Sequence, residues 1–168
     1  IYGFVKKSTL VNNSNSQVRL TVLDGLQNIV PYGVGSDLQN GFSNLVDAYK
    51  KSELQADTGI GIFALSAIIV DKAEPSEALK SSIVWSLGLE NPKFLVSSLQ
   101  LESFRKGKSI HQETNIRAEK GAYFTISELT LEDQGKHSWM FITNVNQSIS
   151  DVVNISEKIK NNSNLKEE

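Results

Sequence analysis

Alternation of apolar and polar residues predicts β-strands along most of the chain. Tyr2 to Leu10 opens with such a stretch, and Gln17 to Leu23 places valine and leucine on one face and arginine and threonine on the other. Between them, Asn12 to Ser16 reads NNSNS, a run of short polar side chains that favour turns. We therefore expect these two segments to pair as a β-hairpin with a long loop.

Two further segments predict strands with different degrees of burial. Gly59 to Val70 is apolar on both faces, which is typical of a strand in the centre of a sheet with both faces covered. Asp71 to Leu79 follows as a turn around Pro75. Ile83 to Leu89 alternates cleanly, so we expect a strand with one face buried.

The second half of the chain continues the β pattern. Phe94 to Phe104 fits both a strand period and a short helix, and Lys106 to Lys120 is polar and reads as a long loop. Ala122 to Ile126 and Glu128 to Leu131 indicate strand separated by a kink. Ser138 to Val145 predicts one more strand.

Two stretches have helical spacing instead. Ser36 and Gln39 match a capping box, in which two side chains satisfy free backbone N–H groups, and apolar residues then recur every three or four positions over a helix near 37–51. A closing helix bears apolar residues from Ile149 to Ile159, with Ser148 or Ser150 as its N-cap.

The crossing between the second strand and the first helix concentrates polar residues. Pro31 and the glycines that follow it stop regular structure, so we expect a turn-rich segment. This segment carries Asp24, Gln27, Asn28 and Tyr32.

Several strands with two helices predict a mainly β fold, an antiparallel β-sandwich with helical additions. We expect a sandwich domain over residues 1–146, with the inserted helix near 37–51, and a C-terminal helix and frayed tail over 147–168. Because the sequence begins at Ile1 and not at methionine, we expect a piece of a longer protein.

Composition narrows the functional classes. The chain has 168 residues, of which 39% are hydrophobic and 21% charged, with a net charge of −2. This balance suits one folded domain and lacks the basic surplus of a nucleic-acid-binding protein. Cysteine is absent, which excludes disulfides and thiolate metal sites. The longest apolar run falls well short of the about 20 residues that a membrane span needs.

No catalytic constellation emerges from the titratable residues. The carboxylates that glycoside cleavage would draw on are Asp24, Asp47, Asp71, Glu74 and Glu77. Nothing in their spacing pairs them, so turn, cap and surface roles are the simpler expectation. His111 and His137 are the only histidines and lie in polar stretches without further metal ligands. We expect no metal and no cofactor.

Aromatic residues offer a second kind of chemistry, because their rings stack on sugars. The candidates are Tyr32, Tyr49, Trp85, Trp139 and Tyr123. Trp85 falls on an apolar strand face and Tyr49 on the apolar stripe of the predicted helix, so core packing is expected for both. Tyr32, in a loop of proline and glycine, is the better candidate for an exposed ring.

Four phrases carry a resemblance to a known family. VLDGLQNIVPYGV, FSNLVDAYKKSEL, GIGIFALSAIIVDKAEPSEAL and SSIVWSLGL resemble the N-terminal β-sandwich of bacterial cellobiose phosphorylase-like enzymes, a branch of the glycoside hydrolases and phosphorylases. The final LTLEDQGKHSWMFITNV and SISDVVNISEKI are similar to the last strands and exit helix of that domain. The resemblance spans most of the chain.

The resemblance implies a galactose-mutarotase-like super-sandwich that precedes a helical linker and an (α/α)6 barrel. The catalytic residues of such enzymes belong to the barrel, so none is transferred to this chain. The residues of the shared motifs would be domain-interface groups first and sugar contacts second: Asp24, Gln27, Asn28, Tyr32, Asn44 and Asp47. Trp85 and Trp139 join them as candidates through their rings.

Three hypotheses follow. The chain is a non-catalytic scaffold that packs on a catalytic barrel and shapes substrate access, with a homodimer possible in this family. Alternatively it is a free-standing carbohydrate-binding module that binds an oligo- or disaccharide through exposed aromatics. A third hypothesis is an interaction domain with an exposed apolar patch on the helix from Ile149 to Ile159. No nucleic acid or membrane is expected as partner, and a bacterial cytoplasmic or periplasmic location stays open.

Overall fold

The computed structural model describes residues 3–35, 45–66 and 80–161. The described strands, in chain order, are β1 (Phe4–Val11), β2 (Val18–Ile29), β3 (Lys50–Gln55), β4 (Ile60–Leu65), β5 (Ser81–Leu87), β6 (Lys93–Leu95), β7 (Asn115–Arg117), β8 (Gly121–Leu131) and β9 (Lys136–Gln147). The described helices are α2 (Leu45–Ala48), α3 (Leu101–Arg105) and α4 (Ile149–Asn161).

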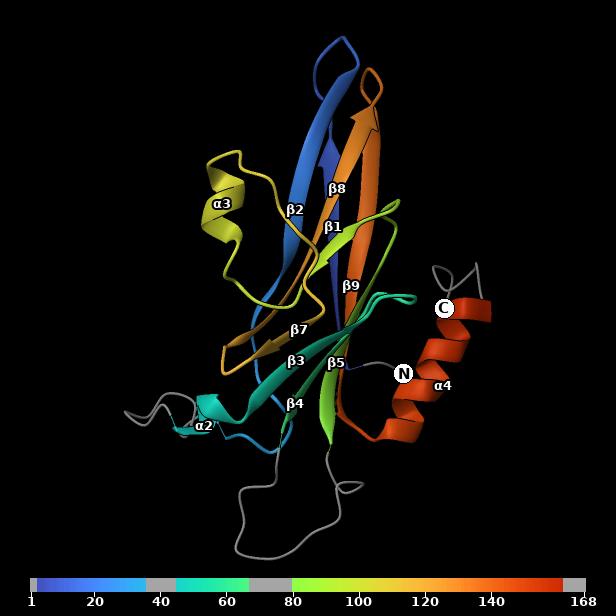
Figure 1. The fold of residues 1–168 in the computed structure, drawn as a ribbon. Coiled ribbons are helices and arrows are strands. Elements are labelled where there is room, and N and C mark those ends of the chain that lie inside the picture. Colours follow the sequence, from blue (N-terminus) through green and yellow to red (C-terminus); the bar gives the residue numbers. More distant parts are fainter. Residues whose placement is uncertain (1–2, 36–44, 67–79, 162–168) are drawn as a thin grey trace, which may run out of the picture.

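The strands form two antiparallel sheets, which confirms the predicted β-sandwich class (Figure 1). The larger sheet has the order β1-β9-β5-β4-β3-β7, and the smaller one the order β2-β8-β6. Every strand pair is antiparallel. β4 lies between β5 and β3, so its predicted central position is confirmed as far as Leu65. The prediction that both of its faces are covered is wrong in part, because Ile62 and Ala64 are only half-buried and line a groove. Residues 67–79 lie outside the described part.

The main core lies between the two sheets. Phe63, Tyr123 and Phe141 are completely buried there, and Val84 and Trp139 pack with them. The Tyr123 ring meets the Phe141 ring edge to face, with centroids 6.1 Å apart. Because side chains alternate along each strand, this core takes every second residue of β4, β5, β8 and β9.

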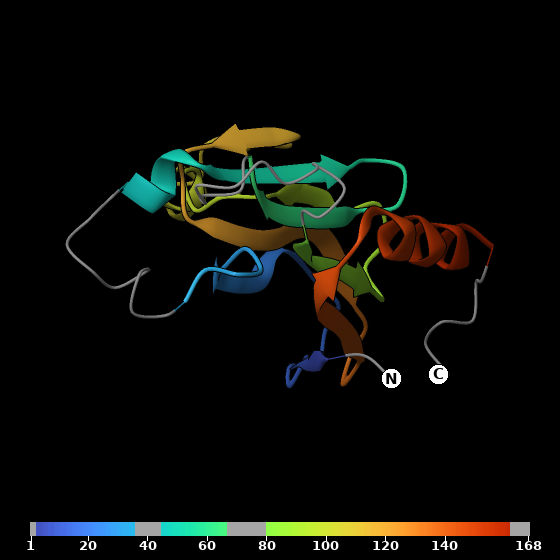
Figure 2. The ribbon, with the colours of Figure 1, turned by 90° about the horizontal axis from the view of Figure 1, so that it is seen from below.

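Each sheet also has a covered outer face. On the larger sheet, Ile83, Trp85 and Ile142 form a buried cluster against which α4 packs Val152 and Ile155. Figure 2 shows α4 lying to one side of the layered strands. On the smaller sheet, a second cluster lies under α3 and the loop that follows it, and comprises Leu95, Ile110, Ala122, Phe124 and Ile126. The described part of the chain therefore forms four layers, which are α4, the larger sheet, the smaller sheet, and α3 with the loop after it.

β5 and β8 differ from the predictions because of these outer layers. β5 was expected to have one buried face, yet Ser81 to Trp85 are all buried, since α4 covers the second face. β8 was expected to kink, yet it runs unbroken past Ser127. The Ser127 hydroxyl donates to the Glu90 carbonyl at 2.9 Å, so this polar residue is satisfied inside the strand.

The predicted hairpin of the first two strands is wrong. β1 pairs with β9 and β2 pairs with β8, so the two strands belong to opposite sheets. The loop between them crosses the sandwich instead of reversing within one sheet. Asn12 holds this crossing from inside, because its buried amide donates to the carbonyls of Ser16 and Glu132, both at 2.8 Å.

β2 also continues further than the sequence indicated. The segment from Asp24 to Gln27 was expected to be turn-rich, but it remains paired with β8 up to Ile29. Gly25 permits this, since a Cβ there would come within 2.0 Å of the Tyr123 carbonyl oxygen. Glycine serves a close approach of two backbones here and not a turn.

The helices agree with the predictions only in part. Residues 36–44 lie outside the described part, α2 is helical at Leu45–Ala48, and the expected helix over 37–51 gives way to strand β3 at Lys50. The open segment after Asn91 contains both alternatives, β6 and then α3. In the expected loop over 106–120, β7 forms a short edge strand. Ser148 is the N-cap of α4, and its hydroxyl accepts from the Asp151 amide at 3.2 Å.

Candidate functional site

Asp24 accepts more hydrogen bonds than any other described residue among the predicted site residues. From β2 its carboxylate accepts hydrogen bonds from Lys6 Nζ at 2.6 Å and Ser8 Oγ at 2.7 Å, both on β1. Trp139 Nε1 donates to it from β9 at 2.8 Å, and the Gly25 amide donates at 2.8 Å. We call Asp24, Lys6, Ser8 and Trp139 the Asp24 cluster. It joins the smaller sheet to the two strands at one side of the larger sheet.

The surroundings of Asp24 fix its charge. Burial alone would raise the pKa of this carboxyl group, but the hydrogen bonds from Lys6, Ser8, Trp139 and the Gly25 amide outweigh it, and the pKa of Asp24 lies below its ordinary value. A carboxylate that stays ionised and holds these donors on both oxygens has no proton to give near neutral pH. The arrangement therefore suits a structural anion and not a general acid.

Gln27 and Asn28 lie further along β2 and are exposed. The Gln27 amide donates to Ser98 Oγ at 3.3 Å. Asn28 has a φ of 57°, at the point where the register with β8 shifts. Asparagine tolerates this left-handed conformation better than most residues, so Asn28 is explained by the bulge.

Tyr32 and Asp47 have different surroundings. Tyr32 lies in the loop after β2 with 45% of its surface exposed. Asp47, on α2, forms an ion pair with Lys50, with 2.6 Å between Asp47 Oδ1 and Lys50 Nζ. The Lys50 side chain is almost entirely buried. Asp47 therefore supplies the counter-charge that a buried lysine requires. Asn44 lies outside the described residues.

Neither tryptophan presents its ring to solvent. Trp85 is 2% exposed in the cluster beneath α4, and Trp139 is 5% exposed in the main core. The predicted core role of Trp85 is thus seen in the structure, and Trp139 is a core residue with its N–H bonded to Asp24. Sugar stacking by either ring would need a rearranged core.

The histidines form no site together. His137 lies on β9 and not in a loop, with Nε2 2.7 Å from the Gly88 carbonyl oxygen and its ring stacked on Trp139. His111 is exposed. Among the described residues, no group of three His, Cys, Asp or Glu side chains lies close enough to hold a metal ion. No described helix is long and apolar enough to cross a membrane.

A second carboxylate, that of Glu113, accepts as many hydrogen bonds as that of Asp24, but it was not among the residues predicted from the sequence. It is 7% exposed, and Oε2 accepts from the amides of Val96 and Ser97 and from the Ser97 hydroxyl, all at 2.9 Å. Oε1 accepts from Gln100 Nε2 at 2.9 Å. We call these four residues the Glu113 cluster. It fastens the segment before β7 to the loop between β6 and α3.

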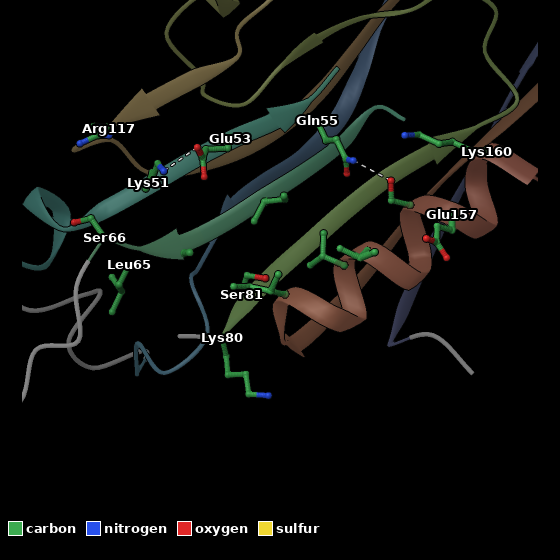
Figure 3. A pocket seen from close by; sticks show the side chains of 16 residues that line it. Lys51, Glu53, Gln55, Leu65, Ser66, Lys80, Ser81, Arg117, Glu157 and Lys160 are labelled. Carbon is green, nitrogen blue, oxygen red and sulfur yellow. Dashed lines mark hydrogen bonds and ion pairs between the residues drawn. The ribbon is translucent and has the colours of Figure 1, made fainter. Parts of the chain in front are cut away.

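The structure also contains a groove between α4 and the open half of the larger sheet (Figure 3). Its volume is about 750 Å³, and we call it the α4 groove. Ile62, Val152 and Val153 give it an apolar floor and wall. Lysine and arginine side chains surround it: Lys51, Lys80, Arg117 and Lys160. The sequence suggested only an exposed apolar patch on this helix, and Ile149 and Val153 are indeed 65% and 48% exposed.

A further groove, of about 670 Å³, lies over the outer face of the smaller sheet beside α3. Phe104 and Ile126 are its apolar contacts, and Glu90, Lys93 and Glu128 contribute charge. Glu128 is already paired with Arg19. Positive and negative side chains are mixed around this groove, so it selects no charge type.

No family model matches the chain, and the search of curated proteins gives no significant match.

Proposed function

We propose that this chain is a non-catalytic β-sandwich domain of a carbohydrate-active enzyme, related to the cellobiose phosphorylase-like glycoside hydrolases and phosphorylases. In this proposal it supports a separate catalytic (α/α)6 barrel and shapes access to it. The fold class is compatible with the proposal. Its family part rests on the sequence phrases DGLQNIVPYG and SNLVDAYKKSEL.

One observation carries the non-catalytic part. The candidate carboxylates of the described chain are already engaged inside the fold: Asp24 with Lys6, and Asp47 with Lys50. Glycoside cleavage requires two carboxyl groups facing one sugar, one of which must hold a proton. Asp24 has a lowered pKa and bonds on both oxygens, so it is unsuited to either task.

The proposal is tested first by activity. The purified chain is incubated with cellobiose and inorganic phosphate, and separately with nitrophenyl glycosides, while released sugar, sugar phosphate and nitrophenol are measured. We expect no turnover above buffer. Turnover by the folded wild-type chain would refute the proposal, and its loss or survival in Asp24→Asn and Asp47→Asn would show whether these two carboxylates or an overlooked site carry it.

The scaffold role is tested separately, by reading the coding sequence on both sides of the segment that encodes this chain. We expect a region that encodes an (α/α)6 barrel. If the flanking sequence encodes no such barrel, the scaffold role is lost even if the chain is inactive.

A carbohydrate-binding module is the alternative, and the exposed ring of Tyr32 is the observation in its favour. Calorimetric titration with cello-oligosaccharides tests it, with Tyr32→Ala as the variant. Calorimetry is the better measurement, because both tryptophans are buried and are poor reporters of binding at Tyr32. Saturable heat that disappears in Tyr32→Ala would favour the module over the scaffold.

A further inference from the structure

The α4 groove has the size of a small-molecule site. Its volume of about 750 Å³ falls within the range of known ligand pockets, roughly 300 to 1,000 Å³. The groove has a polar part from β3 and an apolar part from β4 and α4, and side-chain alternation along β3 explains the polar part. β3 directs Lys51, Glu53 and Gln55 to the groove while Lys50, Ser52 and Leu54 are buried on the other face. Neighbouring β4 and the facing side of α4 supply the apolar surface.

Charge is distributed unevenly around this groove. Its lining includes four cationic side chains and only two carboxylates, those of Glu53 and Glu157. Lys51 is paired with Glu53 at 2.8 Å, and Lys160 with Asp57 at 2.5 Å. Arg117, by contrast, forms no ion pair with any residue that the structure describes.

Lys80 adds a second positive charge that lacks a close partner. It forms no salt bridge within the described chain. The pKa of Asp151 is lowered mainly by the hydrogen bonds from Ser148, and the charge of Lys80 adds to this effect. In Figure 3, Lys51 and Arg117 lie at one end of the groove, and Gln55 and Lys160 at the other. The Arg117 end of the groove therefore favours an anion.

The opposite end offers a hydrogen-bond acceptor. Gln55 Nε2 donates to Ser156 Oγ at 2.9 Å, but Gln55 Oε1 is buried and accepts no hydrogen bond from the described residues. A buried acceptor without a donor is costly, so an occupant with a hydroxyl group would stabilise this end. Lys51 and Gln55 are four positions apart along β3, a span of about 13 Å.

From these features we propose that the α4 groove binds an amphipathic hydroxy acid. The anionic group lies by Arg117, the apolar body lies on Ile62 and Val152, and the hydroxyl donates to Gln55 Oε1. The anion is a carboxylate or a phosphate monoester. This site is independent of the proposed carbohydrate role, because it uses none of Asp24, Tyr32 or Asp47.

The test is calorimetric titration of the chain with 10-hydroxydecanoate and with 10-hydroxydecyl phosphate, both below their micelle concentrations. The controls are 1,10-decanediol, which lacks the anion, and decanoate, which lacks the hydroxyl. We expect saturable binding of at least one hydroxy anion, at least tenfold weaker binding of the diol and several-fold weaker binding of decanoate. The tighter of the two hydroxy anions identifies the head group.

Variants place the ligand in the groove. Arg117→Glu should weaken anion binding at least fivefold and leave diol binding unchanged, whereas Lys7→Glu, the same charge change on β1 outside the groove, should have no effect. Gln55→Leu should remove the advantage of hydroxydecanoate over decanoate. Circular dichroism checks that each variant is folded. Changes in the backbone amide NMR chemical shifts of α4 and β3 on titration of the wild-type chain locate the ligand without any variant.

Three results would overturn the proposal. One is the absence of saturable binding by either hydroxy anion to folded wild-type chain. Another is equal affinity for the diol, which would mean that the groove selects no charge. The third is amide shifts that lie away from α4 and β3. If decanoate equals hydroxydecanoate while the other expectations hold, the assignment of Gln55 is wrong.

Discussion

The Asp24 cluster and the Glu113 cluster each stabilise a carboxylate within the fold, but with different kinds of donor. Each satisfies a carboxylate with four hydrogen bonds, although the Asp24 side chain keeps 22% of its surface exposed and Glu113 only 7%. Asp24 has a cation among its donors, and those donors come from β1, β2 and β9, on both sheets. Glu113 has only neutral donors, two of which are backbone amides of one loop.

The difference indicates what each carboxylate stabilises. The strands of the two sheets share no backbone hydrogen bonds within the described part of the chain, and Asp24 links the sheets through its side chain. It therefore fixes the position of one sheet relative to the other. Glu113 satisfies amides that would otherwise be buried without acceptors, so it fixes the path of one loop. Lys6 is about one third exposed and can regain water if Asp24 is lost, whereas the amides of Val96 and Ser97 beside Glu113 cannot. The neutral cluster should therefore be the more costly one to break.

The largest expected effect is that of Glu113→Ala. The variant leaves the amides of Val96 and Ser97 buried without acceptors, and both residues are at most 1% exposed. We expect the free energy of unfolding in urea to fall by about 3 kcal/mol. Glu113→Gln keeps an acceptor oxygen and should lose less. If Glu113→Ala costs under about 1 kcal/mol, water reaches these amides and the comparison fails.

Asp24→Ala comes next, with an expected loss of about 2 kcal/mol in the same urea experiment. The variant leaves Trp139 Nε1 buried without its acceptor, while Lys6 turns to solvent. Trp139 fluorescence should shift as its N–H loses the carboxylate. A double variant Asp24→Ala with Lys6→Ala measures the coupling of the pair, and it should be less destabilised than the sum of the two single variants. A strictly additive result would mean that the ion pair contributes nothing.

Sequence reasoning found Asp24 but gave it the wrong local structure, because its signals are ambiguous. The segment that carries Asp24 was expected to be turn-rich. The close approach that Gly25 permits, where a Cβ would lie 2.0 Å from the Tyr123 carbonyl oxygen, depends on a strand about a hundred positions away. Hydrophobic alternation predicted the strands well, since burial imposes it directly. It could not predict which strands pair, and so the first two were joined in a hairpin.

Glu113 was missed for a related reason. It lies in a polar stretch, and nothing local distinguishes a buried glutamate from an exposed one. Its donors lie 13 to 17 residues earlier in the chain. The α4 groove has the same property, because Lys51, Arg117 and Val153 come from three distant segments. In contrast, the burial of Trp85 was predictable from the apolar face of its own strand.

A third polar contact, uncharged and fully buried, tests whether charge matters to this ranking. Tyr123 donates from its hydroxyl to the Gly59 carbonyl oxygen at 2.6 Å, and the ring is 0% exposed. Tyr123→Phe removes this neutral hydrogen bond and the longer one with Ser86 Oγ at 3.4 Å, and it should cost about 1 kcal/mol at pH 7. A loss as large as that of Asp24→Ala would show that burial alone sets the cost.

The same residue predicts a response to alkali. Burial raises the pKa of the Tyr123 hydroxyl above its ordinary value near 10. Folding therefore favours the protonated form, and its contribution is complete below about pH 10 and is lost as pH rises above that value. Wild-type chain should lose more stability than Tyr123→Phe between pH 9 and pH 11.5, measured by urea unfolding at each pH. Parallel curves would contradict the assignment.

The smallest effect is expected from acid, and it tests the contribution of the charge of Asp24. Because the pKa of Asp24 is lowered in the folded chain, its stabilising contribution is complete above the unfolded pKa of about 3.9 and is lost as pH falls through the lower folded value. Asp24→Asn has no such titration. Its unfolding free energy should start below that of the wild type at pH 7 and approach it as the pH falls below 4. If the difference in unfolding free energy between wild type and Asp24→Asn instead stays constant down to pH 2.5, the Asp24 cluster depends on hydrogen-bond geometry and not on charge. In that case the Asp24 cluster is stabilised by the same kind of interaction as the Glu113 cluster.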